Sequence, residues 1–153
     1  MDRREMLKVA AGGMVLAAAG NSVFAAENAK HQHTSHQHAH SSGNKNQSLI
    51  DAASESVKQG QACLNHCIEA LSQGDTSLGE CARLVNDMLA ACVAIGQLAS
   101  YNSPHLGKMA RVAMEICEDC EKECRKFANV HDVCKASADA CAACFSECKK
   151  IAA

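Results

Sequence analysis

Two stretches of the sequence repeat cysteine at a spacing that suits a helix. Residues 115–127 read EICEDCEKECRKF and residues 140–149 read ACAACFSECK, and both contain Cys-x-x-Cys-x-x-x-Cys. Neither stretch holds glycine or proline, so neither predicts the loop that usually presents cysteines to a metal cluster. Because residues three and four apart lie on one face of a helix, the pattern predicts helices that each carry a line of thiols.

Helical periodicity extends over the last two thirds of the chain. We predict helices over 48–72, from 76 or 77 to 100, from 103–104 to about 127, and from 130 or 131 to 151. Gly74-Asp75 ends the first helix, and Ser103-Pro104 opens the third with a serine cap and a proline in the first turn. Because the connections are short, neighbouring helices should be antiparallel. The fold class is therefore all-α, an antiparallel up-down-up-down four-helix bundle.

The cysteines of each predicted helix fall on one face. At about 100° per residue, the four thiols of the last helix span an arc of about 80°, and the three of the third helix span about 60°. Charged residues surround the third stripe on its outward side: Glu118, Glu121, Lys122, Glu123 and Arg125. A bundle helix buries one stripe, so the core should be lined with cysteine. The candidate metal ligands are Cys63, Cys67, Cys81, Cys92, Cys117, Cys120, Cys124, Cys134, Cys141, Cys144, Cys148 and His66, with Met88 and His131 as further candidates.

The number and placement of the thiols favour Cu(I). Cysteine as a small apolar residue accounts for one or two buried positions, but not for eleven. Thiols one helical turn apart are about 5–6 Å apart, too far for a relaxed disulfide. Cu(I) is soft and prefers thiolates, whereas zinc takes four ligands in a tetrahedron. If each thiolate is balanced by one Cu(I), capacity is on the order of ten ions per chain. A zinc buffer and an electron carrier with an iron–sulfur or disulfide site remain open alternatives.

Four segments resemble the copper storage proteins: ACLNHCIEAL, LAACVAIGQLA, ICEDCEKECRKF and ACAACFSECKK. The similarity covers residues 48–153. It implies reversible Cu(I) storage in a cysteine-lined four-helix bundle, a homotetramer, and a copper-accepting enzyme or chaperone as partner. Ser56 and Ser137 stand on the thiol face where family members can carry cysteine, which implies a lower capacity. At the open end of the bundle, where the family can use histidine and methionine, this chain has His66, with Ala70, Gln73 and Leu78 at positions where methionine could stand.

The first 47 residues have a different character. Residues 1–25 combine Arg3-Arg4, a mild apolar run and a small-residue exit at Ala25, which predicts a twin-arginine signal and export to the periplasm or cell envelope, with no stable membrane anchor after cleavage. Residues 26–47 form a flexible segment with five histidines between His31 and His40. These histidines could collect metal weakly or serve only as a solvated tether. The chain has no basic stripe and 3% aromatic residues, so we expect no nucleic-acid partner, and it shows no catalytic constellation that would indicate an enzyme.

Overall fold

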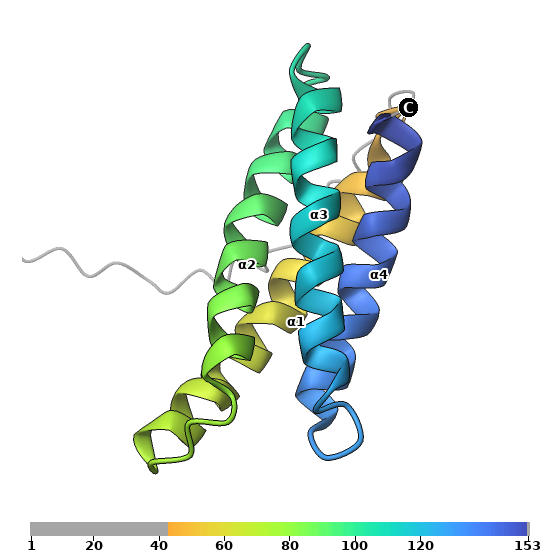
Figure 1. Cartoon of the computed structure of the whole chain (residues 1–153). Helices are drawn as coiled ribbons and strands as arrows, with labels where there is room; N and C mark the ends of the chain where they lie inside the picture. The colour runs from red at the N-terminus through yellow and green to blue at the C-terminus, as the bar shows by residue number, and fades with distance from the viewer. Residues whose placement is uncertain (1–42, 153) are drawn as a thin grey trace, which may run out of the picture. The chain divides into compact units, whose positions relative to one another are not determined.

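The computed structural model describes residues 43–152, so the predicted signal and the histidine tract lie outside the described residues. Within this range the chain forms four α-helices and no strand: α1 Gln47–Ser72, α2 Gly79–Ser100, α3 Leu106–Arg125 and α4 Asp132–Ala152. Consecutive helices run in opposite directions (Figure 1). The predicted all-α antiparallel bundle is confirmed.

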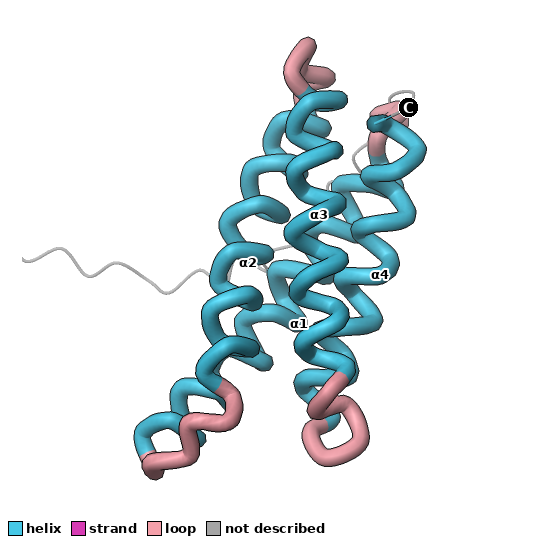
Figure 2. Tube along the Cα trace, viewed as in Figure 1, coloured by secondary structure: helices cyan, strands magenta, loops and turns pink. Residues whose placement is uncertain are grey.

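Each helix packs against two others around a common axis. α1 contacts α2 and α4, and α3 contacts the same two helices from the other side. The α1–α2 and α3–α4 loops lie at one end of the bundle, whereas the α2–α3 loop, the start of α1 and the end of α4 lie at the other (Figure 2). Helices of 20 to 26 residues are about 30–39 Å long, so the two ends are well separated.

The two ends of the bundle have different side chains in their cores. The end with the α2–α3 loop buries only small and aliphatic residues, and we call it the apolar end: Leu49, Ala53, Ile95, Ala99, Leu106, Ala110 and Ala113. The opposite end carries His66 and His131, and we call it the histidine end. The core thiols extend from the histidine end through the middle of the bundle.

Local hydrogen bonds explain where two helices begin. α2 starts at Gly79 rather than at 76 or 77, because the Asp75 carboxylate accepts a bond from the Ser77 amide at 2.9 Å and holds residues 75–78 in a turn. Ser103 caps α3 as predicted, since its hydroxyl oxygen accepts a bond from the His105 amide at 3.2 Å. The first regular residue of α3 is nevertheless Leu106, because the turn before it closes by an amide bond from Leu106 to the Ser103 carbonyl.

Two asparagines fasten the start of α1 to the end of α2. The Asn44 side-chain amide donates to the Ala99 carbonyl at 3.2 Å and to the Ser100 carbonyl at 2.8 Å. The buried Asn46 side chain donates to Ala99 at 3.2 Å and to the Asn102 side-chain oxygen at 3.1 Å. These bonds satisfy carbonyls at the α2 C-terminus that have no partner within the helix. They also fix where the preceding residues leave the bundle.

The outward faces of the helices are polar and charged, with one exception. Most ion pairs join residues one turn apart on an exposed face, and Arg125–Asp139 joins α3 to α4. Glu123, expected among the outward charges, is nearly buried and pairs with Lys126. By length and composition α2 could cross a membrane, but a bundle helix packed against α1 and α3 has the same composition.

Candidate metal centre

All eleven cysteines lie in the core as free thiols, each no more than 1% exposed. Every helix contributes, because helical spacing places the cysteines of each helix on its buried side. The cysteine-lined core expected from the sequence is therefore confirmed. The role of each thiol as a ligand remains a prediction.

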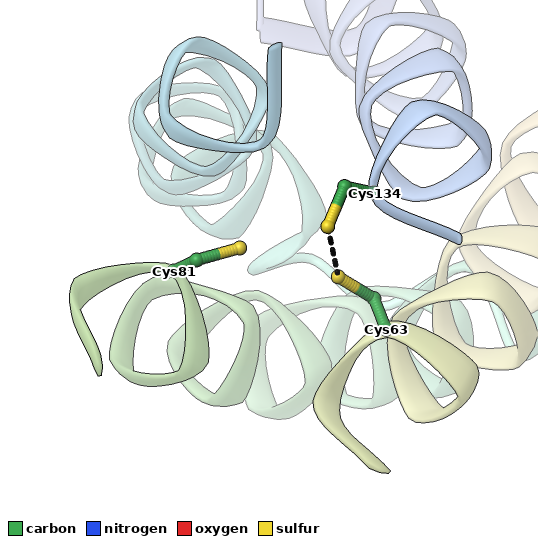
Figure 3. A group of neighbouring side chains, drawn as sticks. All are labelled: Cys63, Cys81 and Cys134. Atoms are coloured by element: carbon green, nitrogen blue, oxygen red, sulfur yellow. Dashed lines mark hydrogen bonds between the residues drawn. The ribbon is translucent and has the colours of Figure 1, made fainter. Parts of the chain in front are cut away.

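Three sulfurs from three helices meet near the histidine end. Cys63 of α1, Cys81 of α2 and Cys134 of α4 point toward one another (Figure 3), with all three sulfurs within 4.8 Å of each other. The sulfurs of Cys63 and Cys134 are 3.7 Å apart. We call these three residues the outer trio.

A second set of three lies deeper in the bundle. Cys92 of α2, Cys117 of α3 and Cys144 of α4 also keep their sulfurs within 4.8 Å of one another. The Cys92 sulfur is 3.9 Å from that of Cys117 and 3.8 Å from that of Cys144. We call these the inner trio. In the described part of the chain, no larger group of this kind forms.

The sulfur separations fit thiolate coordination. A metal ion about 2.3 Å from each of three sulfurs in a plane holds those sulfurs about 4 Å apart. The observed separations of 3.7 to 3.9 Å within the trios are close to this value. Three sulfurs are a ligand number that Cu(I) accepts and one fewer than tetrahedral zinc requires.

The other thiols extend the trios along the bundle axis. Cys124 lies 3.6 Å from Cys81 and 3.9 Å from Cys120, sulfur to sulfur. Cys148 lies 3.9 Å from Cys144 in the same sense. Cys67 and Cys141 are fully buried on the same helical stripes. Sulfurs at these distances could bridge neighbouring ions, so the core can hold more than one ion per trio.

Burial makes uncompensated thiolates unfavourable. It raises the pKa of Cys67 and of Cys134, because the charged form loses its hydration. Neighbouring thiols act in the opposite direction at two positions. Hydrogen bonds, first from Cys120 and from Cys117 respectively, lower the pKa of Cys124 and of Cys144. Each region of the core thus has one sulfur that accepts a negative charge, and further ionisation needs a cation within it.

The two core serines have different surroundings. The Ser56 hydroxyl donates to the Ala140 carbonyl of α4 at 3.1 Å and is 3.0 Å from the Ala52 carbonyl of its own helix. The Ser137 hydroxyl is buried without a hydrogen-bond partner. Both side chains are fully buried, so both stand on the thiol face, as predicted.

Two histidines meet at the histidine end. The ring centres of His66 and His131 are 4.4 Å apart, and the rings are tilted by 54°. Nε2 of His66 is buried and has no hydrogen-bond partner. A hollow of about 230 Å³ opens beside the pair and is lined by His66, Glu69, Ala70, Gln73, Asp75, Leu78 and His131. The sequence grouped His66 with positions 70, 73 and 78, but gave no signal that His131, on another helix, would lie against it.

Met88 packs between two helices. It is fully buried, and its methyl group lies 2.5 Å from the point where a Cβ on Gly60 would stand. The methyl therefore fills the space that glycine leaves on α1. This contact gives Met88 a packing role, and ligation by its sulfur remains a prediction.

Comparisons with known proteins agree with this geometry. Residues 42–153 match the family model described as copper storage protein. The chain is 30% identical over 107 residues, 70% of its own length and 95% of the relative, to the uncharacterized cysteine-rich protein YhjQ of Bacillus subtilis (strain 168). Among solved structures it resembles the Cu(I)-bound copper storage protein BsCsp3, with 30% identity, a TM-score of 0.63, and coverage of 70% of this chain and 97% of that one. It also resembles apo copper storage protein 3 from Bacillus subtilis, with 28% identity, a TM-score of 0.61, and coverage of 70% and 98%.

Proposed function

Because this chain belongs to the copper storage protein family, we propose that it stores multiple Cu(I) ions on the thiolates of its bundle core. The observation that carries this function is the column of eleven buried free thiols, organised around the outer and inner trios. The similarity to a Cu(I)-bound structure at 30% identity supports the choice of ion.

The proposed ligands are the eleven cysteines together with His66. Each Cu(I) takes two or three sulfurs, and sulfurs shared between ions bring the charge of the core close to zero. His131 joins the ligand set at the histidine end, where it stacks against His66. Ions enter there, because the apolar end offers them no donor atom among its described core residues.

A titration tests the storage function. The reduced protein is titrated with Cu(I) in the presence of a competing chelator, and binding is followed by thiolate-to-copper absorption. We expect saturation on the order of ten ions per chain. Saturation at one or two ions would refute storage, and preferential retention of zinc in a parallel titration would favour a zinc buffer.

We further propose that the protein is exported through its twin-arginine signal, assembles as a homotetramer and passes copper to an acceptor protein. Several apolar side chains on the outside of the bundle support assembly, including Ile68, Val93 and Val112, each about half exposed. Light scattering of the purified protein measures the mass of the assembly. Fractionation of the producing cells shows whether residues 1–25 direct export.

A further inference from the structure

The histidine tract is tethered far from the histidine end. Asn44 and Asn46 bind the carbonyls of Ala99 and Ser100, so the described chain begins at the C-terminus of α2, beside the apolar end. The five histidines of residues 31–40 precede Gly43 by 3 to 12 residues. The tract therefore enters the bundle surface at Ser100, at the opposite end from His66.

An open groove begins at the same place. It runs between α1 and α2, measures about 420 Å³, and is lined by Ile50, Ala53, Ser54, Val57, Cys92, Val93, Gly96, Gln97 and Ser100. Its walls are mostly apolar, and no charged side chain lines it. Ser100 belongs both to the groove and to the anchor of Asn44.

Cys92 connects this groove to the metal core. Its side chain lines the groove, and its sulfur belongs to the inner trio with Cys117 and Cys144. Gly96 stands one turn after Cys92 on the same face of α2. Because glycine has no side chain, the space beside Cys92 stays open. An ion that reaches Cys92 from the groove enters the inner trio without passing the outer one.

Chain length decides which site the tract can reach. Cys92 lies eight residues from Ser100, about 12 Å along α2. His66 lies 19 residues from the start of α1, about 28 Å along the bundle. His36 is seven residues from Gly43, and a flexible chain of that length spans about 15 Å, or about 24 Å when fully extended. The groove is therefore within ordinary reach of the tract, whereas the histidine end is beyond the reach of His36.

The chemistry of the groove suits imidazole. A neutral histidine ring has flat apolar faces for the walls formed by Ile50, Val57 and Val93, and a polar edge for Gln97 at the rim. A charged lysine, arginine or carboxylate would find no partner in this groove. Two imidazoles can hold one Cu(I), and the soft thiolate then competes for it.

We propose that the histidine tract, residues 31–40, occupies the α1–α2 groove and passes Cu(I) to the sulfur of Cys92. This inference rests on the proposed storage function. In the transfer a copper–nitrogen bond breaks and a copper–sulfur bond forms, while copper stays in the +1 state. The proton of the Cys92 thiol passes to water.

The test compares Cu(I) uptake by the full chain and by variants of it. One variant replaces all five histidines of the tract by glutamine. A second, Gly96→Leu, fills the groove beside Cys92. The matched control, Ala90→Leu, makes a similar change on α2 in the separate groove lined by Asp87, Ala91, Met109 and Ile116. One equivalent of Cu(I) is supplied as a weak complex, and stopped-flow absorption reports the formation of copper–thiolate bonds.

We expect the tract variant and Gly96→Leu each to slow uptake by about tenfold, because tethering raises the local concentration of bound copper. The combined variant should be no slower than either one alone, and Ala90→Leu should match the parent chain. Losses that multiply in the combined variant, or no loss at all, overturn the proposal. Capacity at saturation is measured on the same samples, so a failure of the storage function itself would appear separately as saturation at one or two ions.

A second measurement keeps the proposal testable if Gly96→Leu does not fold. Gly96→Ala should fold, since a Cβ there meets only the Ala53 Cβ, at an ordinary 3.7 Å. Amide NMR spectra of the full chain and of the tract variant are compared with one equivalent of Cu(I). Docking predicts shifts at Val93, Gln97 and Ser100 that weaken in Gly96→Ala. Superimposable spectra over the groove overturn docking.

Discussion

The unpaired hydroxyl of Ser137 gives a sharp prediction about stability. A buried hydroxyl without a partner costs about 1–3 kcal/mol of folding free energy, and Ser137 is in this situation. A thiol at the same position is a small apolar group with little need for a partner. Ser137→Cys should therefore stabilise the metal-free protein by about 1–2 kcal/mol, after allowance for the larger sulfur atom.

The same substitution at Ser56 should have the opposite effect on stability. Ser56→Cys removes the hydrogen bond to the Ala140 carbonyl, a loss of about 1 kcal/mol. Both variants add one thiolate to the core, so both should raise Cu(I) capacity by about one ion. The two serines thus separate stability from capacity.

Thermal unfolding of the reduced, metal-free chains measures the difference. One kcal/mol corresponds to about 4–8 °C in the Tm of a domain near this size, so the two variants should differ by about 10 °C or more. Ser146→Cys is the control, because Ser146 is exposed on α4 and should change neither stability nor core capacity. Equal Tm shifts at positions 56 and 137, or no gain at 137, would show that Ser137 finds a partner in solution and that the reasoning is wrong.

Three further predictions concern the folded, metal-free protein. Burial raises the pKa of Cys67 and Cys134 above the value of 9.0 for a free thiol; the unfolded chain therefore ionises first, and stability should be full below about pH 9 and fall as pH rises further, which urea unfolding across that range will show unless these thiols gain hydration in solution. Asn46→Ala should lower stability by about 1–3 kcal/mol, because it removes two bonds of a buried amide, and a Tm equal to the parent's would mean that the anchor to α2 contributes nothing. Arg125→Ala should cost less than about 1 kcal/mol in the same assay, since its pairs with Glu121 and Asp139 are solvent-exposed; a larger loss would show that the α3–α4 ion pair holds the bundle together.

Helical spacing was sufficient to predict most of the fold. The thiol stripes follow from the 3.6-residue repeat, so the cysteine-lined core could be deduced before any helix was placed beside another. The start of α2 could not, because Asp75 forms a turn with Ser77 instead of capping a helix at 76 or 77. Turn chemistry of this kind competes locally with helix formation, and periodicity alone does not decide between them.

The details of the site depend on contacts between helices. Spacing placed Ser56 and Ser137 on the thiol face, but only packing shows that one reaches a carbonyl of α4 and the other reaches nothing. The stacking of His66 on His131 and the groove beside Cys92 likewise join residues from different helices. Nothing in a single helix's sequence specifies the lateral offset of its neighbour.

The apolar end of the bundle bears on how the protein would be emptied. Its buried aliphatic side chains, from Leu49 to Ala113, contribute hydrophobic stabilisation whether or not metal is present. In small zinc domains, by contrast, the bound ion supplies the folding free energy, so losing the ion means losing the fold. Here half of the molecule acts as a permanent keel and the other half as a rechargeable hold. Withdrawal of copper then costs ligand bonds but no unfolding, and the same chain can be filled again.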